Sequence, residues 1–408
     1  MSVHALLVNT ISTDPIDALE TDPSVRLTVL THPEYAPYYR PGTPVILIED
    51  VTDLRAVRDA AVALLRAGPI DRVVSPSERS VQPGGYLRSF LGLPGTGYET
   101  ANLCSNKLAM KRRLVACGLP VAPFAGLGAL ADLPARAATL GWPVVVKPAI
   151  GNASRDTHVI AGAAEFAELI ASPRSAGLRG SPYPLIVERF VEVEAEFHCD
   201  GVVSGGEVRF ASVSRYVVPL VRQYGRLGGT YTLPAGSPHN RPITDLHRAV
   251  VAALGLRDGI THLEVLRSGG EYLVGEIAAR PGGCGVADVV RHRYGVDLWR
   301  AFVDISLGRE PVCEPVDTGG VAAVCHLPTM PGRVEQVSTA AEIAALPGVT
   351  GVHGLVRPGE VIGGEVNSSA FAGTVFLRAA DEPGFAAALD RLERAFTLTV
   401  STPAPAVA

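Results

Sequence analysis

The first hundred residues alternate short apolar runs with a helical pattern. Four runs are rich in β-branched residues and have the length of buried strands: VHALLVN at 3–9, VRLTVL at 25–30, VILIED at 45–50 and DRVVS at 71–75. The apolar residues of DLRAVRDAAVALLRAG, at 53–68, recur at helical spacing. Because strands separated by helices are typical of parallel sheets, we expect a parallel α/β domain over residues 1–100.

Residues 101–182 predict a small α+β subdomain. The sequence SNKLAMKRRLVACGLPVAP predicts a helix with Ser105 as its N-cap and Gly118 at its end. A strand, a glycine-containing loop and a second strand are expected in GWPVVVKPAIGNASRDTHVI, at 141–160. A helix is expected in AAEFAELIA, at 163–171.

Residues 183–310 predict a subdomain that is rich in strands. The pattern over 183–216 indicates strands joined by a turn at Gly205-Gly206. Residues 217–243 are rich in glycine and proline, which predicts a long loop of the kind that often covers an active site. The remaining elements are expected in chain order: a helix at 244–256, a hairpin at 259–283 that turns at 268–270, helices near 286–308, a proline-rich linker at 309–320, and a C-terminal α+β segment over 311–408.

Composition and charge exclude several classes of protein. Apolar residues make up 47% of the 408 residues and charged residues 19%, so the chain can form cores and is not a disordered protein. A net charge of -5 offers no footprint for nucleic acid or an anionic membrane. No apolar stretch reaches the ~18 residues of a membrane span and the first ten residues lack a charged leader region, so we expect a cytoplasmic protein. The six cysteines lack metal-binding or disulfide spacing and are expected to be buried thiols: Cys104, Cys117, Cys199, Cys284, Cys313 and Cys325.

Lysine is rare in this chain. Of the 36 basic residues only three are lysine, namely Lys107, Lys111 and Lys147. An ammonium that is retained against so strong an arginine bias indicates a site where a planar guanidinium does not fit. Lys147 ends an apolar strand and precedes the loop AIGNAS, which can present backbone N–H groups to phosphate oxygens. Lys111, in the middle of a basic helix, is expected to be a solvated residue.

Glu264 and Glu276 lie on the two arms of the expected hairpin. Its turn places them roughly opposite each other and on one face, where two carboxylates repel unless a cation joins them. Taken alone, the hairpin favours the alternative of two solvated edge residues. His262 shares the face of Glu264 and is expected to be packed or to contact a ligand residue, and not to act as a catalytic base.

Four motifs in order resemble the ATP-grasp superfamily, and within it the carboxylate–amine ligases. The motifs are SNKLAMKRRL, WPVVVKPAIGNAS, IVERFVEVEAEF and HLEV followed by GEIAARPGG. The chain is most similar to L-amino-acid ligases and more distantly to D-alanine:D-alanine ligase. The resemblance implies an α/β and α+β multidomain protein with an ATP-grasp fold and an N-terminal Rossmann-like parallel α/β domain. NAD binding is not favoured, because no glycine fingerprint follows the first strand.

The resemblance also implies a role for each matching residue. Lys107 and Lys147 would contact the phosphates of ATP, under the loop residues Gly151, Asn152, Ala153 and Ser154. Three residues of the third motif would bind the nucleoside: Glu188 through the adenine amino group, Val191 through its backbone, and Glu196 through the ribose hydroxyls. Glu264 and Glu276 would hold Mg²⁺, with Mn²⁺ as an alternative. Arg280 would face the substrate carboxylate and the acyl phosphate.

Two departures from the family pattern affect these expectations. Many relatives have asparagine two residues after the second metal ligand, where this chain has Ala278, so water is expected to replace that ligand. The stretch from Glu188 to Glu196 is one residue longer than in D-alanine:D-alanine ligase, which makes Glu194 the alternative ribose ligand. Without the resemblance, Glu188 reads as an exposed strand residue and Arg280 as a turn residue.

The expected function is ATP-dependent amide-bond formation through an acyl phosphate, with release of ADP and phosphate. The substrates implied are a small carboxylate and a small amine, such as two amino acids. The alternatives are an ATP-grasp ligase for another carboxylate and an ATP-binding protein without turnover. The sequence does not name the substrates, and the resemblance allows a homodimer.

Overall fold

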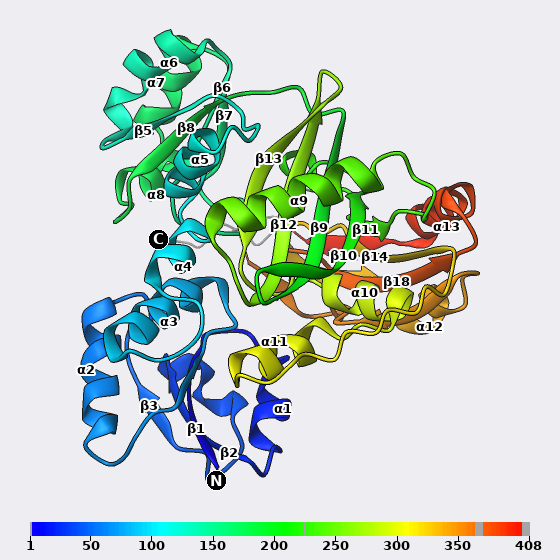
Figure 1. Ribbon diagram of the computed structural model, residues 1–408. Helices are drawn as coiled ribbons and strands as arrows, with labels where there is room; N and C mark the ends of the chain where they lie inside the picture. The colour runs from blue at the N-terminus through cyan, green and yellow to red at the C-terminus, as the bar shows by residue number, and fades with distance from the viewer. Residues whose placement is uncertain (1, 224, 364–369, 402–408) are drawn as a thin grey trace.

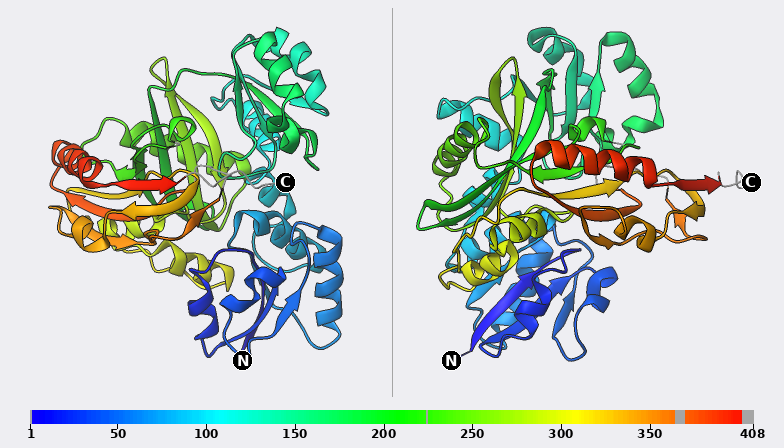
Figure 2. Two further views of the ribbon diagram at one scale, coloured as in Figure 1. Left: turned by 180° about the vertical axis from the view of Figure 1, so that it is seen from behind. Right: turned by 90° about the vertical axis from the view of Figure 1, so that its right-hand side faces the viewer.

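Four β-sheets organise the part of the chain that the computed structural model describes, residues 2–223, 225–363 and 370–401 (Figure 1). One sheet belongs to the N-terminal domain, one to a small lid, and the largest runs through the middle of the molecule. A three-stranded sheet of β15 (Gly332–Val337), β17 (Val361–Ile362) and β19 (Leu398–Ser401) completes the C-terminal segment. The N-terminal domain and the lid lie at opposite ends of the large sheet's body (Figures 1 and 2).

The N-terminal domain is a parallel sheet flanked by helices, as predicted. Its strands have the order β3-β2-β1-β4, with every pair parallel: β1 (Val3–Val8), β2 (Val25–Thr31), β3 (Val45–Leu47) and β4 (Arg72–Val74). The flanking elements are α1 (Ile16–Glu20), η1 (Pro33–Tyr38), α2 (Leu54–Leu65) and α3 (Glu78–Leu91). Helix α3 begins just after the carboxyl end of β4, which is the end of a parallel sheet where ligands commonly bind.

Helices α4 (Tyr98–Leu103) and α5 (Lys107–Ala116) connect the N-terminal domain to the lid. The N-cap of α5 is Asn106, whose side chain accepts hydrogen bonds from the backbone N–H groups of Leu108 and Ala109. The prediction of Ser105 as N-cap is wrong, because its hydroxyl donates to the carbonyl of Ala101 in the last turn of α4.

The lid is an antiparallel sheet with strand order β5-β8-β6-β7. Its elements are β5 (Phe124–Leu127), η2 (Leu130–Asp132), α6 (Leu133–Leu140), β6 (Val144–Pro148), β7 (His158–Ile160), α7 (Ala163–Ala171), η3 (Pro173–Ser175), α8 (Ala176–Arg179) and β8 (Leu185–Arg189). The sheet therefore continues past the boundary expected at 182, because β8 inserts between β5 and β6. This pairing places Glu188 of β8 beside the strand that carries Lys147.

The large sheet has eight strands in the order β13-β12-β9-β10-β11-β14-β18-β16, all paired antiparallel. The strands are β9 (Ala195–Ser204), β10 (Glu207–Tyr216), β11 (Gly228–Thr232), β12 (Gly259–Ser268), β13 (Glu271–Ala278), β14 (Val321–Leu327), β16 (Val349–His353) and β18 (Gly373–Ala379). Helix α9 (Asn240–Leu254) packs on this sheet and against α5. Strand β9 is buried along its whole length, which makes it the centre of the core.

The expected long loop at 217–243 is wrong as a single element. It contains η4 (Leu220–Arg222), strand β11 between β10 and β14, and the first turn of α9. Two adjacent glycines weaken a strand pattern in sequence. Here Gly229 has a φ of +118°, and a Cβ at this position would lie 2.1 Å from the carbonyl oxygen of Val324. The close approach of β14 explains why a glycine sits inside a buried strand.

The C-terminal segment extends the large sheet. After α10 (Val286–Tyr294) and α11 (Leu298–Ser306), residues 309–320 form the predicted linker, which contains no helix or strand. Strands β14, β18 and β16 then join the sheet beyond β11, with α12 (Ala340–Ala344) and α13 (Glu382–Ala395) packed nearby. The view in Figure 2 shows these orange and red elements continuing from the central strands.

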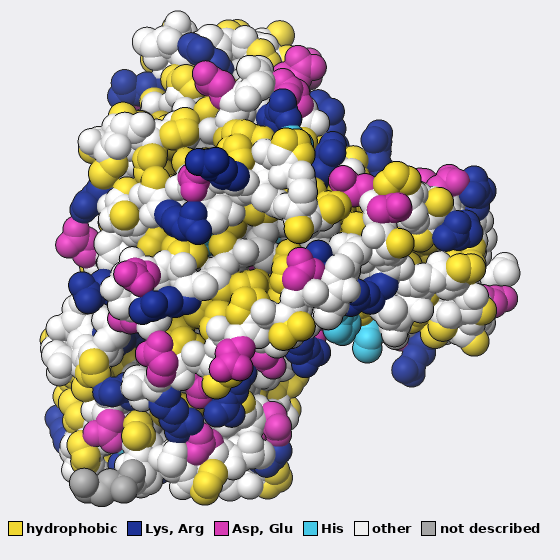
Figure 3. All heavy atoms as spheres, turned by 45° about the vertical axis from the view of Figure 1, so that its right-hand side comes forward, with side chains coloured by type: hydrophobic (Ala, Val, Ile, Leu, Met, Phe, Trp, Pro, Cys, Tyr) yellow, Lys and Arg dark blue, Asp and Glu magenta, His cyan; other side chains and the backbone are white. Residues whose placement is uncertain are grey.

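The surface carries charges of both signs, as the composition predicts. Acidic and basic side chains are interspersed on the face drawn in Figure 3. No helix in the described ranges is long and apolar enough to cross a membrane.

The expectation of buried thiols is wrong for Cys117 and Cys284, which are exposed, and for Cys313, which is half-buried. Cys117 caps the exposed end of α5, and Cys284 lines the cavity described next.

Candidate active site

A cavity of about 320 Å³ lies between the lid sheet and the large sheet. Every site residue expected from sequence lines it: Lys107, Lys147, Gly151, Asn152, Ala153, Ser154, Glu188, Val191, Glu196, Glu264, Glu276 and Arg280. These residues come from five separate stretches of the chain, and the fold brings them together. The cavity therefore defines one site, and its contacts indicate what each group can do.

The loop after β6 closes over one end of the cavity. Ala153 and Ser154 both have a φ of 55°, a left-handed conformation that costs energy for residues with a Cβ. The Nζ of Lys107 donates to the carbonyl of Gly151 at 2.7 Å, and the backbone N–H of Lys107 donates to the carbonyl of Ala149 at 2.8 Å. Lys107 thus ties the loop to the start of α5, where an ammonium and the loop's backbone face the same space.

All three lysines belong to this region, and the expectation that Lys111 is solvated is wrong. Only 1% of Lys111 is exposed, and its Nζ lies 3.1 Å from one carboxylate oxygen of Glu188. The Nζ of Lys147 lies 3.1 Å from the other oxygen. Burial alone would raise the pKa of Glu188, but the two ammonium groups hold it at about 2. Glu188 is therefore a buried carboxylate and not the exposed strand residue that its sequence pattern allows.

Glu264 and Glu276 are register partners across the β12–β13 hairpin, as expected. A bulge at Gly275 follows this pair, so that Val265 faces Val274. A quarter of each glutamate side chain remains exposed, and the Nζ of Lys107 lies 2.8 Å from Glu276. The two carboxylates thus project together into the cavity beside a fixed cation.

The acidic groups around this hairpin have pKa values shifted in different directions. Although burial acts to raise it, the pKa of Glu264 is lowered by His262 and by the two nearby lysines. Burial, followed by the repulsion of Glu264, raises the pKa of Glu196 to about 8. Glu196 also accepts a hydrogen bond from the backbone N–H of Leu220 at 2.7 Å. Ala278 ends β13 opposite His262 and is buried. Its methyl side chain offers no metal ligand.

Arg280 is held by a residue that the sequence analysis did not single out. Its Nε and Nη2 lie 2.7 and 2.6 Å from one carboxylate oxygen of Glu78, the first residue of α3. Its Nη1 donates to the carbonyl of Pro281 at 2.8 Å. The N-terminal domain therefore contributes a charged group to the site. Because 202 residues separate the two partners, no local sequence signal could have found this pair.

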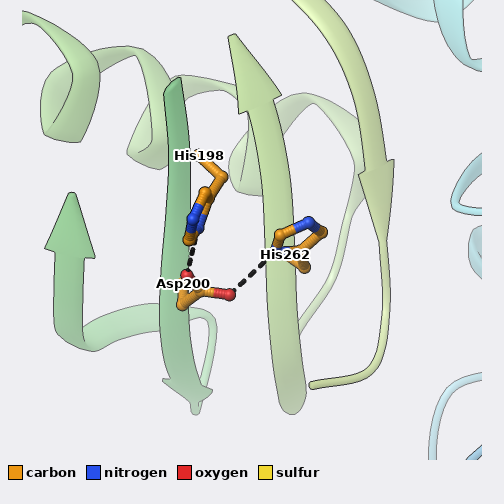
Figure 4. A group of neighbouring side chains, drawn as sticks. All are labelled: His198, Asp200 and His262. Carbon is orange, nitrogen blue, oxygen red and sulfur yellow. Dashed lines mark hydrogen bonds and ion pairs between the residues drawn. The ribbon is translucent and has the colours of Figure 1, made fainter. Parts of the chain in front are cut away.

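A buried cluster of His198, Asp200 and His262 joins β9 to the hairpin strand β12 (Figure 4). The carboxylate of Asp200 bridges the two imidazoles, 2.6 Å from His198 Nδ1 and 2.8 Å from His262 Nδ1, and His198 Nε2 lies 2.6 Å from the hydroxyl of Thr230. These are direct hydrogen-bond distances, so the three side chains form a hydrogen-bonded network. It directs His262 Nε2 toward Glu264, 3.8 Å away, as expected for a histidine that contacts a ligand residue.

The C-terminal segment supplies a further wall of the cavity that sequence reasoning missed. His326 on β14 is within hydrogen-bond distance of the carbonyl of Cys284, at 2.9 Å, and of Gln223 Nε2, at 3.4 Å. Its ring stacks on Phe371 with ring centroids 4.5 Å apart. Burial lowers the pKa of His326, so this wall presents a neutral imidazole.

Comparisons with known proteins identify the family. Residues 112–290 match the ATP-grasp domain family, and residues 326–401 match the L-amino acid ligase C-terminal domain 2. The chain is 35% identical over 374 residues to the L-arginine-specific L-amino acid ligase of Bacillus subtilis, an alignment that covers 90% of each protein. The chain is an L-amino acid ligase of the ATP-grasp superfamily. This ligase is thus an enzyme that forms carbon–nitrogen bonds.

Solved structures agree with the ligase in fold. The L-amino acid ligase from Bacillus licheniformis superposes with a TM-score of 0.80 at 19% identity, over 98% of this chain and 99% of that one. A carboxyaminoimidazole ribonucleotide synthase from Aspergillus clavatus, solved with ATP, has a TM-score of 0.71 at 16% identity, over 96% of this chain and 99% of that one. The predicted ATP-grasp architecture is therefore confirmed.

Proposed function

We propose that this ligase activates the carboxylate of one amino acid with ATP and joins it to the amine of a second amino acid or a small amine. The observation that carries the proposal is a single cavity in which two lysines, two opposed carboxylates and an arginine converge. A carboxylate is a poor electrophile, so the γ-phosphoryl group is first transferred to it to form an acyl phosphate. The amine then attacks the acyl carbon, and phosphate leaves.

The lysines and the loop after β6 suit the phosphates of ATP. Phosphoryl transfer depends on positioning and on neutralisation of charge, which compact ammonium groups supply. Lys107 and Lys147 both line the cavity, as does the loop from Gly151 to Ser154, and the Nζ of Lys107 donates to the carbonyl of Gly151. These contacts support the assignment of both lysines and of this loop to the phosphates.

The nucleoside is assigned to the strand that carries Glu188 and to the residues after it. Oε1 of Glu188 pairs with the Nζ of Lys147 at 3.1 Å, and a carboxylate oxygen has a second acceptor position that suits the adenine amino group. Val191 and Glu196 also line the cavity, which supports backbone contact with the ring and ribose binding by Glu196. Glu194 is the weaker candidate for ribose, because it pairs with Arg267 and accepts from the N–H of Gly270.

Glu264 and Glu276 fit a magnesium ion. Their oxygens are hard ligands that face each other from adjacent strands, and the low pKa of Glu264 keeps that residue ionised. When bound, magnesium would offset the charge on the β- and γ-phosphates. Asp200 and His262 hold Glu264 in place, and with Ala278 in the third position, water is proposed to complete the coordination.

Arg280 is proposed to bind the carboxylate of the first substrate and the acyl phosphate formed from it. A guanidinium presents planar, paired donors that match both groups. The Nε and Nη2 groups of Arg280 face Glu78, so an incoming carboxylate must share or displace that partner. An α-amino acid brings an ammonium that can replace the arginine as a partner of Glu78, which supports amino acids as substrates.

The deciding experiment incubates the purified ligase with ATP, MgCl₂ and amino acids in pairs, beginning with arginine because the Bacillus subtilis relative is named for it. Chromatography resolves the nucleotides, and hydroxylamine traps an acyl phosphate as a hydroxamate. We expect ADP, phosphate and a dipeptide. AMP with pyrophosphate would overturn the mechanism, ADP release with a non-amino-acid carboxylate alone would favour the alternative ligase, and no turnover at all would favour a protein that only binds ATP. The cytoplasmic location and the homodimer expected from sequence both remain predictions.

A further inference from the structure

The three lysines of this ligase form one connected system, although only two of them line the cavity. Lys107 and Lys111 are one helical turn apart on α5 and therefore share a face. Lys111 lies behind Glu188, on the side away from the cavity, and its Nζ also donates to the carbonyl of Val274 on β13 at 3.4 Å. It is among the largest fully buried side chains of the described chain, which is unusual for a lysine.

The charges around Glu188 explain why a second lysine is needed there. Lys147 and Glu188 alone would be a neutral pair, and a neutral pair gives little attraction for a phosphate. With Lys111 on the other oxygen, the group of two ammoniums and one carboxylate keeps one net positive charge. Because the charge of Lys111 is buried, the excess positive charge is available on the cavity side, at Lys147.

We propose that Lys111 is a positioning residue for the nucleotide, which neutralises Glu188 from the interior so that Lys147 stays available to the phosphates and Glu188 stays oriented toward adenine. This inference rests on the proposed placement of ATP at Glu188. Lys111 itself is not proposed to touch the nucleotide. Its effect must therefore pass through Glu188, so a change at Lys111 should alter the recognition of the adenine amino group.

A purely structural role for Lys111 is the alternative to be separated. Through Glu188 and Val274 it connects α5 with the lid strand β8 and the large-sheet strand β13, so its loss could simply loosen the fold. Loosening would weaken the binding of any purine nucleotide to a similar extent. Loss of the proposed function would instead weaken the recognition of the adenine amino group most.

The test compares Lys111→Met, Glu188→Gln and the double variant in calorimetric binding of ATP and of inosine triphosphate, which lacks the amino group. Lys111→Met is expected to weaken ATP binding about ten-fold or more and to lower the preference for ATP over inosine triphosphate. The double variant should bind ATP no more weakly than Glu188→Gln. Arg113→Gln is the matched control, because Arg113 lies on the same helix and pairs with the exposed Glu99.

Three outcomes would overturn the inference: unchanged ATP binding by Lys111→Met, an equal loss for both nucleotides, or additive losses in the double variant. If Lys111→Met does not fold, the comparison of the double variant with Glu188→Gln decides alone, since both lack the buried carboxylate charge. Amide formation by the wild-type ligase tests the proposed function separately, because these binding measurements contain no amino acid.

Discussion

At the scale of single residues, Lys147 connects the strand β6 to the cavity. One fifth of its side chain is exposed, and its ammonium is balanced by Glu188, its diagonal neighbour across the β6–β8 pair. Arginine occupies almost every other basic position in the chain. A longer, planar side chain at this position would extend into the space between the two sheets, which accounts for the retention of lysine.

Replacement of Lys147 by alanine should weaken ATP binding and slow turnover, because one of the groups that neutralise the phosphates is lost. We expect a loss of affinity of about ten-fold or more, measured by calorimetry and by the KM for ATP. Arg113→Gln, which removes an exposed ion pair, should leave both quantities unchanged. Wild-type affinity in the alanine variant would contradict the assignment.

Residue identity placed Lys107 and Lys147 in the cavity lining, where they lie, and failed for the third lysine, which is buried and not solvated. The bias against lysine indicated that all three needed an explanation, but Lys111 stands beside Arg112 and Arg113 in a run that resembles a solvated helix face. The ion-pair partner of Lys111 lies on a strand of the lid, 77 residues further along the chain. Only the packing of α5 beneath that strand shows that this position is interior.

At the scale of elements, the β12–β13 hairpin was predicted apart from its bulge, because the information for its strands and turn is local. Alternating residues and two glycines indicate the strands and the turn, but it is the bulge at Gly275 that shifts the register and makes Glu264 and Glu276 partners. Strand β11 was missed because its stability comes from pairing with β10 and β14. These pairings leave no continuous strand pattern in the local sequence. The location of β8 in the lid failed for the same reason, since strand order depends on long-range pairing.

Changing either hairpin carboxylate to its amide tests the metal assignment. Glu276→Gln and Glu264→Gln keep the shape of the side chain but remove negative charge from a hard-cation ligand. Activity should collapse or require much more magnesium, as measured in a titration of rate against MgCl₂. An unchanged magnesium dependence in both variants would remove the hairpin from the metal site.

Helix α9 should make stability depend on pH. His247 is fully buried, its Nε2 lies 2.8 Å from the hydroxyl of Thr261, and a Cβ at Gly201 would lie 2.5 Å from its ring. Burial lowers its pKa to about 4. Since the folded state keeps this imidazole neutral while the unfolded chain protonates near pH 6.5, stability falls as pH falls from about 6.5 to about 4.

Urea unfolding of the wild type and of His247→Gln measures this effect. Between pH 7 and pH 5 the wild type should lose about 2 kcal/mol more of its free energy of unfolding than the variant, which has no titrating group at this position. Parallel curves for the two proteins would show that His247 is not the group responsible. His239, the less buried N-cap residue of the same helix, can be changed to glutamine as a comparison.

At the scale of the whole molecule, the pair of Glu78 and Arg280 joins the N-terminal domain to the centre of the site. Glu78 begins α3 at the carboxyl end of the parallel sheet, and Arg280 follows β13 at the edge of the large sheet. The N-terminal domain, for which sequence suggested no role in chemistry, thereby controls the orientation of the proposed carboxylate-binding group.

Arg280→Lys keeps the charge and loses the paired planar donors. We expect the rate of amide formation to fall about ten-fold or more, equivalent to at least ~1.4 kcal/mol of transition-state stabilisation, with ATP affinity largely preserved. Steady-state rates at saturating ATP, together with calorimetric ATP binding, separate the two effects. A fully active lysine variant would remove this role from Arg280 and leave the acyl-phosphate route intact.

The continuity of the large sheet limits how the ligase can be divided. The backbone of β11 is paired on one side by β10 and on the other by β14, which belongs to the C-terminal segment. A chain that stops at the linker would keep β11 with one row of N–H and C=O groups unsatisfied, and such an open edge recruits other strands. We therefore expect a protein truncated after residue 310 to self-associate, as light scattering would detect. Exchange of C-terminal segments between relatives would then succeed only if the junction lies outside the sheet and the donor's first strand matches the hydrogen-bonding register of the recipient's β11.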